Sequence, residues 1–200
     1  MLQIHRIVND YQHSCTYILY EEDCEYAWLV DCGGSDAVEE WLKANRKSLK
    51  GVFLTHCHDD HIYGLRRLVK ELPDLIVCLS AHEGIKGVQD IRLNLSKYTS
   101  EPFQLFSDHF LELKDGEKVT LFPDVEMTAI QAYGHSPDSM VYRAESYLLT
   151  GDAYIPPLPV VTKLPGADKK RAAESLEMIK KLVEIEKLTV LPGHDINWNK

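Results

Sequence analysis

The chain has 200 residues, of which 44% are hydrophobic and 26% are charged, and its net charge is −9 with histidine neutral. This length and composition predict a single domain over residues 1–200 with a sizeable core. The acidic balance argues against a nucleic-acid partner, and no apolar run reaches the length of a membrane span. We therefore expect a small-molecule partner, with no nucleic acid and no membrane; a homo-oligomer stays open.

The cysteines and the start of the chain indicate the compartment. There are five cysteines, an odd number, and no Cys-x-x-Cys pair, so a disulfide framework is not expected. Residues 1–8 alternate like a strand and contain no apolar signal region. We predict a cytoplasmic protein.

The first fifty residues predict three antiparallel strands and a helix. The strands are expected at 3–8, 14–20 and 25–30, separated by polar turns. The third strand ends at Asp31 before two glycines, where an aspartate is about as often a turn residue as a functional one. A helix is expected over 35–47, because acidic side chains fall in its first turns and basic ones at its end.

The middle of the chain predicts alternating strands and helices. A strand over 51–55 leads into a polar loop, and a helix from about 62 to 72 ends before Pro73. A short buried strand is expected over 75–79, and 81–87 is a short helix or a turn.

The second half predicts further strands, one long helix and two long loops. The strands are expected at 109–113, 117–122, 125–132, 140–144, 146–150 and 188–191. The helix is expected from about 168 to 185. The loops, 88–108 and 153–166, have no clear period; such loops are often functional, although a plain surface connection is equally open for the first. The pattern predicts two layers of sheet with helices outside.

The most informative stretch is the loop after strand 51–55, which carries His56, His58, Asp60 and His61. Imidazole and carboxylate are preferred ligands of Zn²⁺ and related metals, whereas so many polar groups at a strand end make poor core material. The alternative is a surface loop that is rich in histidine by chance. The spacing is not that of a His-Glu-x-x-His helix, and a loop of this kind suits two metals better than one.

Cys57 lies inside this cluster and is a possible metal ligand by residue type. We expect its side chain to point toward the core instead, with the histidines on either side facing the metals.

Three other strands also end at potential ligands. His135 follows strand 125–132, Asp152 follows strand 146–150, and His194 follows strand 188–191. A glycine stands immediately before each of them and lets the chain turn sharply as it leaves the sheet. If these strand ends share one edge, the ligands converge there.

Together these residues resemble the metallo-β-lactamase superfamily of metal-dependent hydrolases. The signature His-x-His-x-Asp-His stands at 56–61, the next histidine in Gly-His-Ser-Pro, the bridging carboxylate in Leu-Leu-Thr-Gly-Asp and the last histidine in Leu-Pro-Gly-His-Asp. The resemblance runs nearly end to end. It implies an α+β fold, the four-layer αβ/βα sandwich.

The resemblance also implies roles for these residues. The first metal would be held by His56, His58 and His135, and the second by Asp60, His61 and His194, with Asp152 bridging both. Asp31 would support the metal-binding loop from behind. The expected cofactor is two Zn²⁺ per chain, with Fe²⁺ as the alternative.

The implied activity is hydrolysis of an ester, thioester or lactone by a hydroxide bound to two metals. Asp60, which can orient the nucleophile, and Asp152 are the catalytic candidates. Tyr154 and Lys163, in the loop 153–166, are candidates for contact with the substrate.

The sequence departs from the family pattern in three places. Asp138 replaces the usual glycine after His-Ser-Pro, and Cys15 replaces a common asparagine. The helical domain that binds glutathione in glyoxalase II-like thioesterases has no counterpart after His194. We therefore do not expect true glyoxalase II activity.

Two other functions stay open. A persulfide dioxygenase of the same family would use one Fe²⁺ held by His56, His135 and Asp152. A non-enzymatic metal-binding module is the second alternative, although such a module would be expected to have lost a ligand. A flavo-diiron oxidoreductase, a processing nuclease and a β-lactamase fit less well. The first would have glutamate at His58, the second would add RNA-binding arms, and the third would carry a secretion signal.

Overall fold

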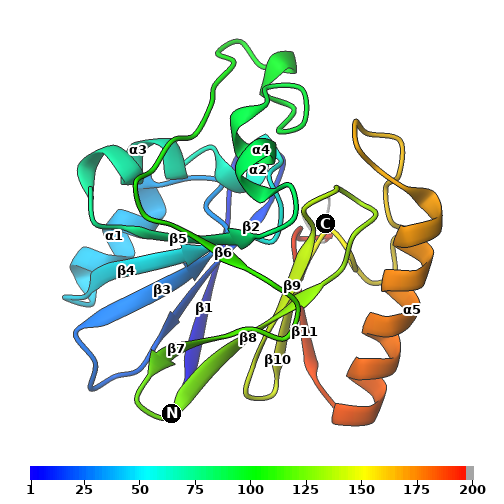
Figure 1. The fold of residues 1–200 in the computed structure, drawn as a ribbon. Coiled ribbons are helices and arrows are strands. Elements are labelled where there is room, and N and C mark those ends of the chain that lie inside the picture. Colours follow the sequence, from blue (N-terminus) through cyan, green and yellow to red (C-terminus); the bar gives the residue numbers. More distant parts are fainter. Residues whose placement is uncertain (197–200) are drawn as a thin grey trace.

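The structure is a computed structural model that describes residues 1–196, so residues 197–200 of the expected domain lie outside the described residues. Two β-sheets pack against each other, and helices cover their outer faces (Figure 1). This arrangement confirms the expected α+β class and the four-layer αβ/βα sandwich.

The first sheet contains the strands of the N-terminal half. They are β1 (Gln3–Val8), β2 (Cys15–Tyr20), β3 (Tyr26–Val30), β4 (Ser48–Phe53), β5 (Ile76–Ser80) and β6 (Phe110–Leu113), in that order across the sheet. The pairs β1–β2 and β2–β3 are antiparallel, whereas β3–β4, β4–β5 and β5–β6 are parallel. Parallel pairing directs the C-terminal ends of β3 and β4 to the same edge.

The second sheet has the order β11-β10-β9-β8-β7. Its strands are β7 (Lys118–Phe122), β8 (Val125–Gln131), β9 (Met140–Ala144), β10 (Tyr147–Gly151) and β11 (Thr189–Pro192). Only β10–β11 is parallel among these pairs, and this pairing directs the ends of β10 and β11 to one edge.

The helices follow the predicted order, with one correction. They are α1 (Asp36–Ala44), α2 (Asp59–Ile62), α3 (Leu65–Glu71), α4 (Gly84–Gln89), a 3₁₀ turn (Ser96–Tyr98) and α5 (Lys169–Glu186). The prediction of one helix over 62–72 is wrong, because two helices occupy this segment and the first begins inside the histidine loop. Gly64 separates them, and a Cβ there would lie 2.5 Å from the backbone of Gly34.

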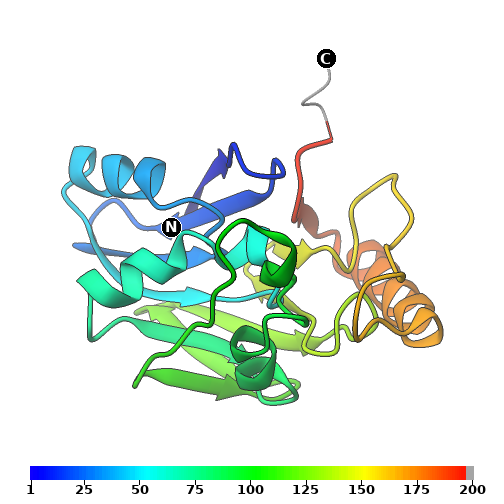
Figure 2. The same cartoon turned by 90° about the horizontal axis from the view of Figure 1, so that it is seen from above.

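Three apolar layers hold the elements together. The largest lies between the sheets and includes Trp28, Phe53 and Tyr142. The ring of Phe53 is tilted against that of Trp28, with centroids 5.3 Å apart, and meets that of Tyr142 edge-on at 5.2 Å. The second layer joins the first sheet to α1 and α3, and the third joins the second sheet to α5. Seen from above, α5 and the pair α1 and α3 lie on opposite sides of the molecule (Figure 2).

Two further sequence expectations meet the structure here. No helix among the described residues is both long and apolar enough to cross a membrane. The five cysteines are all free, as expected for a chain without a disulfide framework.

Candidate metal centre

The candidate ligands converge because the strands that carry them end at one edge of the two packed sheets. Hydrogen bonds join the sheets at this edge: Met140 N donates to Thr55 O at 2.8 Å, and Tyr142 donates its hydroxyl hydrogen to Leu54 O at 2.8 Å. The loop after β4 is thereby fixed against the second sheet. The pattern of strand ends seen in the sequence therefore corresponds to one place in the fold.

Six of the seven expected ligands form two groups in the structure. One possible ligand atom from each of His56, His58 and His135 lies within 4.8 Å of the other two. The same holds for the second set, Asp60, His61 and His194. These are the two sets that the resemblance implied.

Asp152 lies between the two groups. Its Oδ2 atom is 3.6 Å from Nε2 of His135 and 3.4 Å from Nε2 of His194. Its Oδ1 atom is 3.5 Å from Nε2 of His61. A carboxylate in this position can bridge two metals, one in each group.

Two glycines make this close approach possible. A Cβ at Gly193 would lie 2.2 Å from Oδ1 of Asp152, so a larger residue could not bring β11 against the bridging carboxylate. Gly151 has a φ of +48°, and a Cβ there would lie 2.5 Å from Oγ1 of Thr55. The sequence predicted sharp turns at these positions, and the structure adds that space is limited as well.

Four histidines direct one ring nitrogen away from the centre and the other toward it. Nδ1 of His135 lies 3.0 Å from Val161 O, and Nδ1 of His194 lies 3.0 Å from Gln12 O. Nδ1 of His61 lies 2.8 Å from Oδ2 of Asp31. A carbonyl or carboxylate at Nδ1 holds the proton there and leaves Nε2 free to bind a metal.

His56 is oriented in the same way through a hydroxyl group. Thr55 donates its only hydroxyl hydrogen to Oδ2 of Asp31 at 2.7 Å, so in its contact with His56 the hydroxyl oxygen is the acceptor and Nδ1, 3.0 Å away, is the donor. His58 differs, since its Nδ1 lies 3.1 Å from Nε2 of His135 within the first group.

Asp31 connects several parts of this network. It is 2% exposed and also accepts a hydrogen bond from Thr55 N at 2.8 Å. Its φ of +58° is unusual for a residue other than glycine, and such conformations concentrate at functional sites. Asp31 thus contacts both Thr55 and His61 of the ligand loop, and its role in supporting a metal site stays a prediction.

Replacing Asp31 by asparagine is expected to weaken zinc binding about 10- to 100-fold, the usual effect of removing a partner that orients a metal ligand. An amide has one acceptor oxygen and cannot accept from Thr55 and His61 as the carboxylate does. Zinc affinity, measured by competition with a chelator, tests this. Asp36→Asn, an exposed position on α1, is the control, and equal affinity in both variants would contradict the prediction.

Several buried polar atoms of the cluster have no hydrogen-bond partner among the described residues. They are His56 Nε2, His58 Nε2 and Asp152 Oδ1. Buried nitrogen and oxygen atoms nearly always have partners, so these atoms indicate a missing group. The donor set of imidazole nitrogen and carboxylate oxygen fits zinc or a neighbouring transition metal.

Burial keeps the first group in the form that binds metal. It lowers the pKa of His58 to about 3 and holds the pKa of His56 well below its usual value. The pKa of His135 is lowered for the same reason. These imidazoles are therefore neutral at neutral pH.

The second group carries protons when no metal is bound. Burial opposes the charge on His61 and His194, but the surrounding carboxylates outweigh it and raise their pKa values to about 9 and about 11. Burial likewise opposes the charge on Asp152, yet its histidine neighbours lower its pKa. A metal at this group would take the place of these protons.

The structure adds residues that the sequence did not single out. The carbonyl groups of Gln12 and Val161 and the hydroxyl group of Thr55 all orient ligand histidines. Thr55 precedes the signature directly, which was a usable signal. The two carbonyl groups come from loops distant in sequence and left no signal.

Three side chains discussed from the sequence lie outside the group of ligands. Cys57 is fully buried against α4 and the following loop, in agreement with the expectation that it points away from the metals. The ring of Tyr154 packs against α5, with Nζ of Lys180 5.7 Å from its centroid. Lys163 is exposed. The roles of Tyr154 and Lys163 in substrate binding stay predictions.

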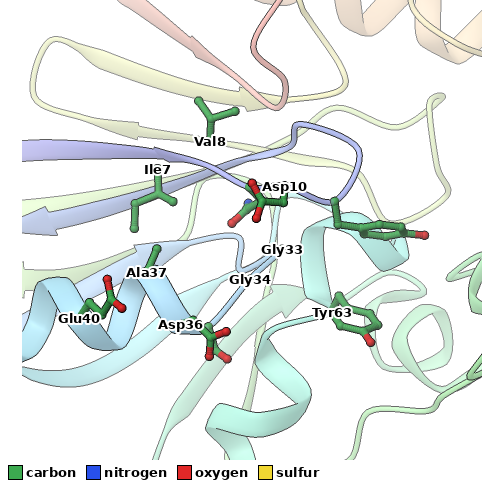
Figure 3. A pocket seen from close by; sticks show the side chains of 12 residues that line it. Ile7, Val8, Asp10, Gly33, Gly34, Asp36, Ala37, Glu40 and Tyr63 are labelled. Carbon is green, nitrogen blue, oxygen red and sulfur yellow. The ribbon is translucent and has the colours of Figure 1, made fainter. Parts of the chain in front are cut away.

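A pocket of about 400 Å³ lies beside this centre (Figure 3). It is bounded by the end of β1, the start of α1 and the rings of Tyr11 and Tyr63, whose centroids are 5.7 Å apart. None of the seven candidate ligands lines it. Tyr11 connects the pocket to the ligand loop, because it donates a hydrogen bond to Asp59 at 2.6 Å.

Comparison with known proteins agrees with this geometry. Residues 8–194 match the model of the Metallo-beta-lactamase superfamily. A hydroxyacylglutathione hydrolase from Pseudoalteromonas translucida (strain TAC 125) is 25% identical over 152 residues, which cover 76% of this chain and 50% of the relative. A second hydroxyacylglutathione hydrolase, from Prochlorococcus marinus (strain NATL1A), is 27% identical over 129 residues, which cover 61% of this chain and 43% of the relative. The chain thus spans about half the length of the curated relatives it matches.

Solved structures show the same fold. The B3 metallo-beta-lactamase BLEG-1 superposes with a TM-score of 0.80 at 26% identity, covering 98% of this chain and 92% of that one. TTHA1623 in a di-iron-bound form gives a TM-score of 0.78 at 22% identity, covering 96% and 92%. ETHE1 from Myxococcus xanthus gives a TM-score of 0.71 at 21% identity, covering 98% of this chain and 77% of that one.

The fold and the buried cluster of histidines and aspartates define a protein with the metallo-β-lactamase fold and two candidate metal-binding groups. The chain belongs to the metallo-beta-lactamase superfamily, which confirms the family expected from the sequence.

Proposed function

We propose that the chain is a hydrolase with two Zn²⁺ ions that cleaves an ester, thioester or lactone of a small molecule. The observation that carries the proposal is the position of Asp152 between two complete triads of ligand atoms. A binding module would need only one such triad. The hydroxyacylglutathione hydrolases among its relatives support a thioester as one substrate class.

Bound metals of this kind lower the pKa of water to about 7, supply hydroxide at neutral pH and polarise a carbonyl group. The protein's own part is to place its side chains. Asp60 directs Oδ2 toward Nε2 of His194 at 3.2 Å and toward Nε2 of His61 at 3.6 Å. From there it would orient the attacking water, while Asp152 keeps the two triads together.

A β-lactam is the second candidate substrate. It is favoured by the likeness to the B3 metallo-beta-lactamase BLEG-1, which covers almost all of both chains at 26% identity. Both reactions attack a carbonyl carbon, and they differ in the leaving group.

The test is metal content together with a substrate panel. The protein is expressed with zinc and iron both available, its metals are counted by mass spectrometry, and thioesters, lactones, aryl esters and a chromogenic β-lactam are assayed. About two zinc ions per chain and hydrolysis of a thioester or lactone are expected. About one iron per chain with no hydrolysis would contradict the proposal and favour a persulfide dioxygenase. Cytoplasmic location stays part of the proposal.

A further inference from the structure

Asp138 has a carboxyl group buried beside the proposed first metal site. The residue is 3% exposed. The carboxyl group accepts a hydrogen bond from the hydroxyl of Ser136, at 2.7 Å from Oδ1, and lies beside the thiol of Cys57 under α4; both neighbours are neutral. Burying a carboxylate costs free energy, and neutral donors offset only part of this cost. A smaller apolar residue at this position would avoid the cost.

The thiol that contacts Asp138 belongs to the ligand loop. Cys57 lies between His56 and His58, and its Sγ atom is also 3.6 Å from Leu93 O. α4 closes over this contact, because a Cβ at Gly87 would lie 2.9 Å from Sγ of Cys57 and 3.3 Å from Oδ2 of Asp138. The centre of the ligand loop is thus held from behind by three separate segments.

The hydroxyl that contacts Asp138 belongs to the other ligand segment. Ser136 follows His135 directly, and its Oγ atom also lies 2.7 Å from Oγ of Ser139. Ser139 Oγ in turn accepts from Ser136 N at 3.1 Å. These bonds fix the tight turn in which His135 stands.

We propose that Asp138 is a positioning residue for the first metal site. Its carboxyl group joins the loop of His56 and His58, which follows the first sheet, to the turn of His135, which follows the second sheet. It thereby sets the distance between ligands that come from different sheets. The 3.1 Å between His58 Nδ1 and His135 Nε2 is the distance that this contact holds. The inference rests on the proposed metal centre.

The test measures metal binding step by step, without activity. The metal-free full-length protein is titrated with Zn²⁺ against a chromophoric chelator, and with Co²⁺ while its absorption bands are recorded. In Asp138→Ala we expect the zinc step of the first site to weaken about 10- to 100-fold and the cobalt bands to change, as is usual when a partner that orients ligands is lost. The other zinc step should keep its affinity.

Two further variants make the result specific. Asp138→Asn keeps the shape and one acceptor oxygen, so it should fold and recover part of the affinity. Leu105→Ala, which removes a side chain that is 1% exposed from the neighbouring loop, should lower Tm and leave both zinc steps unchanged.

The outcomes separate this inference from the proposed function. The inference is overturned if Asp138→Ala behaves like Leu105→Ala, or if both zinc steps weaken equally. It is supported if only the first step weakens and asparagine restores part of it. A wild-type protein that binds two metals but hydrolyses nothing in the substrate panel would contradict the proposed function and leave this inference standing.

Discussion

Asp152→Ala is expected to abolish turnover, with a loss greater than the 10- to 100-fold typical for partners outside the ligand set. Asp152 lies between both triads, with oxygen atoms 3.4–3.6 Å from histidines of each. Without it, His61 and His194 lose a negative partner and the two sites lose their common ligand. Steady-state kinetics on a substrate found in the panel, together with metal counts, measures the effect.

The matched control for this variant is Asp124→Ala, at an exposed position in the turn between β7 and β8. It should keep wild-type kcat and two metals per chain. If Asp152→Ala retained both metals and more than a tenth of wild-type kcat/KM, the bridging role would be wrong.

Removing the metals is expected to lower both activity and stability. A ligand at about 100 times its Kd stabilises the folded state by about 2.7 kcal/mol. For a chain of this size that corresponds to a fall in Tm of about 5–10 °C per site on treatment with a chelator. Thermal unfolding, followed by circular dichroism with and without the chelator, measures the shift.

Adding zinc back should restore Tm and turnover together. Asp152→Ala, which is expected to bind metal weakly, should show a much smaller response to the chelator than the wild type. If the chelator left the wild-type Tm unchanged while mass spectrometry showed that the metals were gone, metal binding would not be coupled to the stability of the fold.

The sequence pointed to a candidate ligand set, whose members the structure brings together, because the chemistry of these residues is unusual and local. Histidines and aspartates at the ends of apolar strands have few other uses, and glycines before them mark sharp turns. The order of the strands and helices followed from hydrophobic period and turn residues. The error at 62–72 arose because the apolar residues keep helical spacing across this segment and Gly64 itself has helical backbone angles. Its role depends on the backbone of Gly34, which lies against it.

The orientation of the ligands depends on contacts that no local pattern contains. From the sequence alone, Asp31 was as easily a turn residue as a residue that supports the ligand loop. The structure favours support, because the Asp31 carboxylate contacts Thr55 and His61. Asp138 was only a departure from a family pattern until its contacts with Ser136 and Cys57 were visible.

By itself, then, the sequence determined which side chains are available for metal chemistry and that they stand at strand ends. Only the tertiary structure decided that two sheets bring these ends to one edge, how far apart the candidate ligands lie, and which ring nitrogen of four of the histidines faces the candidate metal sites. The physical reason is that residue type and period are local properties. Hydrogen bonds between loops such as those to Gln12 O and Val161 O exist only after both sheets have packed.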